Sequence, residues 1–455
     1  MAPSLHCVNS PFPFPLSDSQ PSQLPSSLKS SRLSRLLLAG ISLFLLAAPS
    51  HAEDFQGSTH DIPYDEAPLH YSEQTPDDPI ARLQKKIDSG EVKLRWDEKF
   101  GYLPALLDAL QVPASSQMLV FSKTSLQRAY ISPQNPRALY YNDDVYLGYI
   151  PGAPRMEVSA VDPKLGGIFY TLDQEQVRKP KLQRDGDCLR CHAAARSMGV
   201  PGHILRSIAT DETGEMDAKT EVQEITHCTP LADRWAGWYV TGTHGKQTHR
   251  GNLVGAEAFA RQETEPNYLG NLTDLSKFFD VSNYVRPSSD LCAEMVLEHQ
   301  AHMHNYITRL NYETQTMMAS YGHIRYLHHQ VDAFLRYLLF TEEAPLSEPV
   351  AGNSSFAQDF MAHGPRDHAG RSLRDLDLQT RLFKYPCSFL IYSPAFDDLP
   401  EVMRTHLLQR LFDVLSGKDR DAQFAKISPE TRQAILEILR ETKPNLPDYW
   451  RVPAA

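Results

Sequence analysis

The chain has 455 residues and a formal net charge of −11 at pH 7, from 45 basic and 56 acidic side chains. An acidic surface repels polyanions, so this balance argues against nucleic acid and anionic lipid surfaces as partners and favours a basic protein partner. With only six cysteines, the composition also excludes a small fold held together mainly by disulfides.

The N-terminal segment has the pattern of an export signal. Residues 29–52 combine three basic side chains with an apolar run over residues 36–48 and a small-x-Ala sequence that ends at Ala52, which is typical of a secretory signal peptide. We therefore predict a signal peptide over residues 1–52, cleaved near Ala52, and a periplasmic product. The apolar run is short for a bilayer span, so we expect a processed chain that is not embedded in a membrane.

The next segment, residues 53–174, predicts an N-terminal α+β domain. A polar arm leads to a short helix expected over residues 80–89, and a series of β-branched and aromatic runs follows, separated by turn residues. This spacing suits an antiparallel meander, and a small antiparallel sheet with an N-terminal helix is PAS-like in outline. The runs cover residues 117–121, 138–141, 145–150, 156–161 and 167–172.

The most specific motif is Cys-Leu-Arg-Cys-His at residues 188–192. Two thiols separated by two residues can reach the two vinyl groups of one porphyrin, and the imidazole that follows can ligate its iron. We therefore expect one covalent haem c, held by Cys188 and Cys191, with His192 as the proximal iron ligand. The surrounding residues 175–279 show little periodicity and predict a loop-rich haem c-binding region.

The cysteine pair has three alternative interpretations: a redox pair, a zinc site and a plain disulfide. A thioredoxin-like redox pair begins a helix that follows an apolar strand, whereas residues 179–187 are polar. A zinc site needs two further ligands, and the sequence has no second closely spaced cysteine pair. A plain disulfide is the remaining alternative. Cys228, Cys292 and Cys387 are expected as small buried side chains.

The second axial ligand of the iron decides between two classes of function. Two strong ligands favour electron transfer, whereas an open position lets a small molecule bind. We favour His227, because it precedes the aromatic segment 234–239, which could pack against a haem. The other candidates are Met198, His203, His244 and His249, and Arg234, Lys246 and Arg250 are candidates to pair with the haem propionates.

Residues 280–455 predict a mainly helical C-terminal domain. Apolar residues recur every three or four positions between Cys292 and Leu310, behind N-cap candidates at residues 288–290. Further helices are expected over residues 323–340, 401–416 and 429–442.

The first of these helices also carries a polar stripe and an apolar-face histidine, His299. Residues spaced by three or four positions on a helix can converge on one ligand, so a second metal site is one hypothesis. A buried polar network that links the helix to the haem region is the other. The stripe consists of Glu298, His302, Asn305 and Arg309.

Almost the whole processed chain resembles a family of exported bacterial proteins described only as cytochrome c domain-containing. The matching stretches are residues 140–149, 188–192, 199–202, 234–242, 297–300 and 444–450. The resemblance implies haem binding and electron transfer, without a defined substrate.

Taken together, the residues predict a periplasmic monohaem c-type cytochrome that exchanges electrons with a redox protein partner. The first alternative is a c-type haem enzyme or sensor with an open distal site for peroxide or a small nitrogen or oxygen ligand. The second is a structural protein with a zinc-bound Cys-x-x-Cys-His segment.

Overall fold

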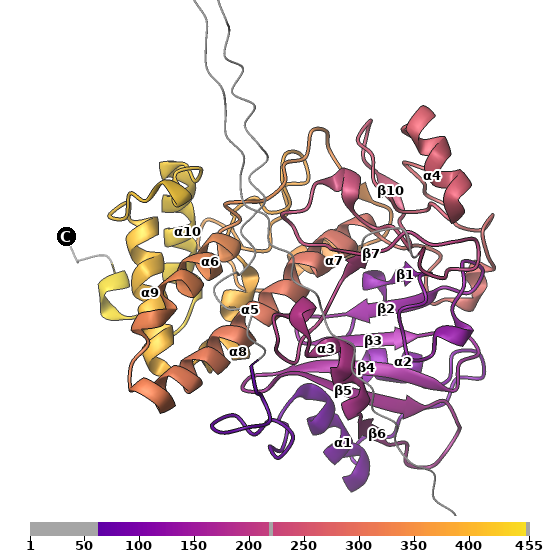
Figure 1. The fold of residues 1–455 in the computed structure, drawn as a ribbon, viewed down its shortest axis with the longest axis horizontal. Helices are drawn as coiled ribbons and strands as arrows, with labels where there is room; N and C mark the ends of the chain where they lie inside the picture. The colour runs from indigo at the N-terminus through magenta and orange to yellow at the C-terminus, as the bar shows by residue number, and fades with distance from the viewer. Residues whose placement is uncertain (1–61, 218–221, 452–455) are drawn as a thin grey trace, which may run out of the picture. The chain divides into compact units, whose positions relative to one another are not determined.

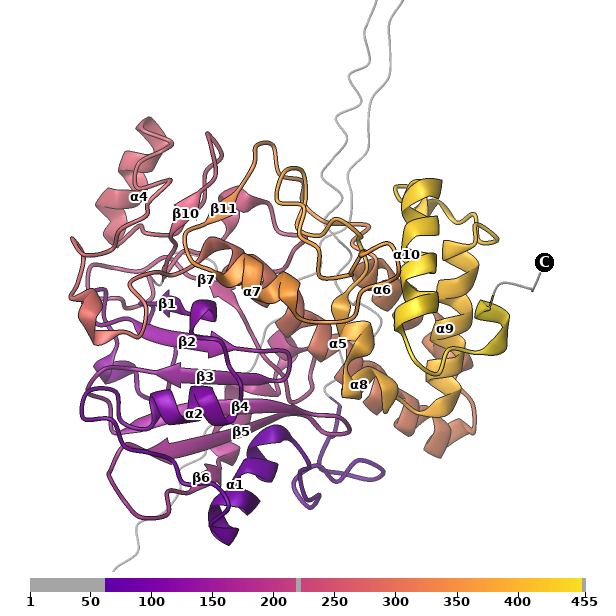
Figure 2. The same ribbon diagram turned by 180° about the vertical axis from the view of Figure 1, so that it is seen from behind.

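A computed structural model of the chain describes residues 62–217 and 222–451. Contacts divide the chain into two units, residues 1–50 and 51–455, and every described residue belongs to the second. The predicted signal peptide over residues 1–52 lies outside the described residues. The described residues form a mixed α and β fold with an antiparallel sheet and several helices, so the α+β prediction is confirmed (Figures 1 and 2).

The central feature is a seven-stranded antiparallel sheet with the order β6-β5-β4-β3-β2-β1-β9. The five runs predicted as strands form a meander in which each strand pairs with the next. Its strands are β1 (Met118–Val120), β2 (Arg137–Tyr141), β3 (Val145–Tyr149), β4 (Arg155–Asp162) and β5 (Gly166–Asp173).

Two further strands attach the motif-bearing segment to both edges of this sheet. Strand β6 (Leu182–Arg184) pairs with β5, and β9 (Trp238–Tyr239) pairs with β1. The domain boundaries at residues 174 and 279 stay predictions. The sheet nevertheless contains strands from both sides of residue 174, because β6 and β9 follow it in the chain. The motif at residues 188–192 therefore follows directly after an edge strand.

The sheet separates two clusters of buried apolar side chains. Alternate residues of a strand point to opposite faces, so Met118 and Val120 join one cluster while Leu119 and Phe121 join the other. The second cluster is covered by α1 (Pro79–Ser89), which Asp78 caps, and by α2 (Leu103–Ala109).

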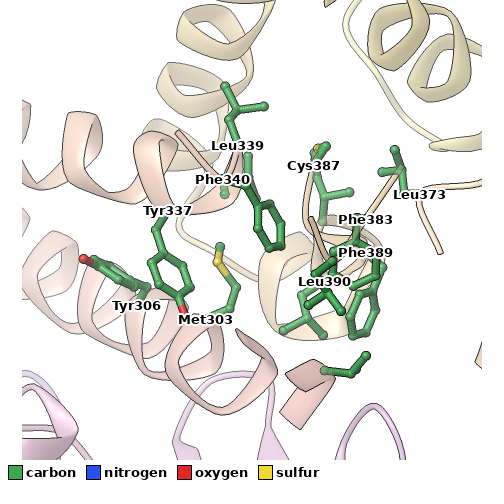
Figure 3. Packing of buried hydrophobic residues seen from close by; sticks show 14 of the residues in the cluster. Met303, Tyr306, Tyr337, Leu339, Phe340, Leu373, Phe383, Cys387, Phe389 and Leu390 are labelled. Atoms are coloured by element: carbon green, nitrogen blue, oxygen red, sulfur yellow. The ribbon is translucent and has the colours of Figure 1, made fainter. Parts of the chain in front are cut away.

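The first cluster is organised by α5 (Leu291–Tyr321), a 31-residue helix that Asp290 caps. Helices α6 (His328–Leu338), α9 (Glu401–Leu415) and α10 (Pro429–Thr442) pack in the same cluster. Figure 3 shows part of it, where Tyr306 of α5 lies 5.0 Å from Tyr337 of α6, measured between ring centroids. Nearby, Phe383 lies 5.3 Å from Phe340 and 6.0 Å from Phe389.

The remaining regular elements are short. In the described part of the chain, no helix is both long and apolar enough to cross a membrane. The short elements are α3 (Leu189–His192), α4 (Gly255–Thr264), α7 (Phe356–Ala362), α8 (Pro394–Asp397), β7 (Arg206–Ser207), β8 (Gln223–Glu224), β10 (Gly242–Thr243) and β11 (Ala351–Gly352).

Candidate functional site

The Cys-x-x-Cys-His motif occupies one helical turn. Residues Gly186–Cys188 form a 3₁₀ turn, and α3 (Leu189–His192) continues it. Side chains three and four positions apart on a helix lie on the same face, so the turn places Cys188, Cys191 and His192 on one side. Cys191 is exposed, Cys188 is half-buried, and both are free thiols.

The environment of Cys188 does not suit a thioredoxin-like redox pair. Burial, with a smaller contribution from the negative charge of Asp185, raises the pKa of the Cys188 thiol to about 12. A reactive cysteine needs a lowered pKa, because the thiolate is the nucleophile. Cys188 is therefore a protonated thiol at neutral pH.

The ring of His192 is oriented by a backbone hydrogen bond. Its Nδ1 lies 2.9 Å from the carbonyl oxygen of Gly202, and since a carbonyl only accepts, Nδ1 carries the hydrogen. Nε2 is then left with its lone pair, and among the described residues it has no hydrogen-bond partner. Burial lowers the pKa of His192, which favours the neutral imidazole. Metal-ligating histidines have this form and this hydrogen bond.

The loop that supplies Gly202 is fastened to α5. Asn305 brackets His203, since its Oδ1 accepts from the His203 backbone N–H at 2.9 Å and its Nδ2 donates to the His203 carbonyl at 2.7 Å. One turn further on, Arg309 donates to the carbonyl of Met198 at 2.7 Å. Two residues of the predicted polar stripe therefore hold the segment that orients His192.

Replacement of Gly202 by Ala is expected to disturb this arrangement. A Cβ at residue 202 would lie 2.1 Å from Oδ1 of Asn305, so either the loop or the Asn305 side chain must move. We expect a loss of about 1–3 kcal/mol in the free energy of unfolding, as for overpacked sites, measured by urea denaturation.

Gly186→Ala is the matched control for this substitution, because a Cβ there meets nothing within 4 Å. It lies on the other side of the same motif. Equal stabilities of the two variants would show that the Asn305 contact does not constrain the loop.

His227, the favoured candidate for the second axial ligand, packs against residues of α5 and α6 and the residues that follow α6. Its Nδ1 is 3.0 Å from Nδ1 of His299, and its ring centroid lies 4.1 Å from Tyr337 and 4.3 Å from Phe340. None of these neighbours contacts His192, whose ring lies 4.6 Å from Phe169. The structure thus does not bring His227 to the motif, and its role as a ligand stays a prediction.

The histidine that shares a neighbour with His192 is His203. Its ring centroid lies 5.6 Å from Phe169, and its Nε2 is 2.9 Å from the hydroxyl of Ser159. Nδ1 of His203 is buried and has no hydrogen-bond partner within the described part of the chain. The sequence placed His203 only among several candidates, because its proximity to Phe169 depends on how β5 packs against the loop.

One of the residues expected to pair with propionates has its charged group engaged by the protein. Arg234 is buried and donates to Glu298 at 2.7 Å and to the carbonyls of Thr229 and His227. Lys246 donates to Glu348 only through its backbone N–H. The Arg250 guanidinium lies 5.4 Å from the ring centroid of Phe259 on α4.

The cations that do lie near His192 were not identified from the sequence. Arg137 on β2 and Arg206 on β7 both act electrostatically on the His192 ring. Arg137 is paired with Glu157 at 2.9 Å, whereas the Arg206 guanidinium has no hydrogen bond or ion pair to any described residue. No local pattern marks these arginines, because Arg137 lies on the central sheet and Arg206 on a separate two-stranded sheet of β7 and β8, and only the fold brings both to the motif.

A zinc site finds no ligand set in the structure. Among residues 62–217 and 222–451, no group of three or more His, Cys, Asp or Glu side chains is placed to hold a metal ion.

No protein-family model matches the chain, and neither the curated proteins nor the solved structures contain a significant match.

Proposed function

We propose that this chain is a periplasmic c-type cytochrome that carries one covalent haem and transfers electrons. Cys188 and Cys191 would form the thioether bonds, and Nε2 of His192 would ligate the iron. The observation that supports this most directly is the hydrogen bond from Nδ1 of His192 to the carbonyl of Gly202 at 2.9 Å. It leaves Nε2 of a neutral ring free, one residue after a pair of free thiols at the spacing of a haem attachment motif.

When bound, the haem supplies one-electron oxidation and reduction. The protein's own part is to hold and orient: Gly202 fixes the tautomer of His192, and Asn305 fixes the loop that carries Gly202. Arg206, whose guanidinium has no hydrogen bond or ion pair to a described residue, is suited to face a propionate, because guanidinium groups bind carboxylates through paired hydrogen bonds. This proposal also includes the PAS-like outline and the loop-rich haem segment. It includes a basic redox partner as well, which the net charge of −11 favours.

A haem enzyme or sensor is the second candidate, and a small cavity that His203 lines supports it. The cavity of about 10 Å³ is lined by Arg196, His203, Glu298 and His302, among others. Such a space accommodates about one water molecule, and polar side chains around it could bind a small ligand. Carbon monoxide distinguishes the two functions, because it binds a ferrous haem with an open position and not one with two strong protein ligands.

Haem attachment is tested by mass. The chain is exported through a periplasm that attaches haem c, then unfolded, alkylated and weighed, and the expected result is the added mass of one tetrapyrrole together with a haem stain on a denaturing gel. The Cys188→Ala/Cys191→Ala variant should lose both signals, whereas Cys228→Ala, which removes a thiol outside the motif, should keep them. A wild-type chain without the added mass would disprove the proposal.

A further inference from the structure

A larger cavity lies away from the motif. Its volume is about 620 Å³, within the range typical of small-molecule sites. It is lined by α1, the end of α2, the β2–β3 turn, Gln300 of α5, α7 and Arg374, and no lining residue belongs to the segment 175–279.

One hydrogen-bond acceptor in this cavity has no partner among the described residues. The carboxylate of Asp144 has no hydrogen bond or ion pair to a described residue, and burial together with Asp143 raises its pKa to about 6. Gln300 also lines the cavity, and its Nε2 donates to the carbonyl of Asn142 at 2.8 Å and to the hydroxyl of Tyr146 at 2.9 Å. Its Oε1 is enclosed by protein and out of a ligand's reach.

About half of the residues that line the cavity are apolar or aromatic, and the others are polar or charged, among them Arg82, Lys86 and Arg374. A ligand that fits would present a ring to the apolar and aromatic residues and a hydrogen-bond donor to Asp144. Hydroxyl groups on an aromatic ring meet both requirements. The apolar and aromatic lining residues include Leu83, Val92, Leu110, Tyr141, Phe356 and Phe360.

A continuous series of ring contacts connects this cavity to His192. From His192 the ring centroids are separated by 4.6 Å to Phe169, by 5.6 Å to His203 and then by 4.1 Å to Tyr146. Tyr146 stacks on Tyr141 at 6.4 Å, with 15° between the ring planes. Tyr141 lines the cavity, and the Tyr146 hydroxyl accepts from Gln300, which also lines it.

We infer that the 620 Å³ cavity binds a small aromatic reductant with hydroxyl groups, of the hydroquinone type, and that Tyr146, His203 and Phe169 form the route of its electrons to the haem. The inference rests on the proposed function. Electrons cross packed atoms more readily than gaps, and each step of this route is a direct ring contact.

Each chain has one haem motif, so a bound hydroquinone gives up one electron and one proton and becomes a semiquinone, while the ferric haem becomes ferrous. Two released semiquinones disproportionate to one quinone and one hydroquinone, so that in sum one hydroquinone and two ferric haems give one quinone, two ferrous haems and two protons. Asp144 accepts the protons one at a time and returns them to solvent, since the residue is not fully buried.

Binding is tested on the reduced, haem-loaded protein, where no electron transfer can occur. Tetramethylhydroquinone is titrated anaerobically by calorimetry. We expect Asp144→Asn to weaken binding by about tenfold, the usual effect of one lost charge-assisted hydrogen bond. Asp108→Asn removes the same charge from the exposed face of α2, outside the cavity, and should bind as the wild type does. Equal affinity of both variants, or no binding, overturns the inference.

The route is tested by mixing ferric, haem-loaded protein with tetramethylhydroquinone and recording haem reduction by stopped-flow absorbance. The rate should saturate with reductant concentration, and Tyr146→Leu should lower the saturated rate by an order of magnitude. Tyr146→Phe, which keeps the ring, should retain it, and so should Tyr130→Leu, an exposed control. Dithionite, which can reach the exposed motif directly, should reduce every variant alike.

The outcomes separate the two claims. A rate that rises linearly with reductant concentration, or that is the same in Tyr146→Leu and the wild type, overturns the route while the haem is present. If the mass measurement shows that the chain carries no haem, the result contradicts the proposed function and not only the route.

Discussion

Replacement of Arg234 by Met is expected to lower the free energy of unfolding by about 3–5 kcal/mol at pH 8, because it removes one partner of a buried ion pair. The Arg234 side chain is 2% exposed and that of Glu298 is 0% exposed, and the two are joined at 2.7 Å. Glu298 also accepts from Nε1 of Trp235. Without Arg234, the carboxylate would be left charged in the protein interior or would have to take up a proton.

The effect of this variant should depend on pH, and its sign follows from the pKa of Glu298. Burial raises this pKa to about 7 even with Arg234 present, and removal of the positive charge must raise it further. At pH 5 the carboxyl group is protonated in the variant and no charge is stranded. The loss of stability should therefore be smaller at pH 5 than at pH 8, as measured by urea denaturation at both values.

Two comparisons show whether the stranded carboxylate is the cause. Arg234→Met/Glu298→Gln keeps an acceptor for Trp235 without a charge and should recover part of the loss. Arg190→Met removes an arginine whose pair with Asp187 is exposed, and it should change stability by less than about 0.5 kcal/mol. A double variant no more stable than Arg234→Met would contradict the explanation.

The sequence predicted the elements whose evidence is local. The meander of β1 to β5 follows from alternating runs and the turns between them, and α10 follows from the cap at Ser428 and the proline at its first position. Strands β6 and β9 have three and two residues, too few to show a period. Their positions depend on pairing across the sheet, such as that of Val120 with Trp238, which no local pattern records.

The candidate site divides in the same way. Cys188, Cys191 and His192 are identified by spacing alone, because their chemistry needs them within five residues. The orientation of His192 depends on Gly202, and that of the loop on Asn305, which is distant in sequence. His227 was favoured because aromatic residues follow it, but Trp235 of that segment is directed to Glu298 on α5, and His227 itself lies against His299.

Acid should destabilise the protein, because several histidines are buried in the neutral form. Burial lowers the pKa of His249 to about 3 and that of His304 to about 4, from an ordinary value of 6.5. Below pH 6.5 the unfolded chain therefore binds protons that the folded chain does not. Between pH 6.5 and the folded pKa, each such histidine lowers the free energy of unfolding by about 1.4 kcal/mol for every unit of acidification. Glu298, whose pKa is raised, opposes this trend as the pH falls below about 7.

The contribution of one histidine can be isolated with His304→Gln. Nε2 of His304 donates to the carbonyl of Asp143 at 2.8 Å, and Nδ1 is buried without a partner among the residues that the structure describes, so a glutamine amide can keep the one hydrogen bond without titrating. We expect the free energy of unfolding of this variant to fall less steeply between pH 6 and pH 4.5, by about 1.4 kcal/mol per pH unit. His329→Gln, on the exposed face of α6, should leave the slope as it is in the wild type. A His304→Gln variant with the wild-type slope would mean that His304 already takes up its proton in the folded protein. The native state would then have to admit water to a side chain that is only 2% exposed.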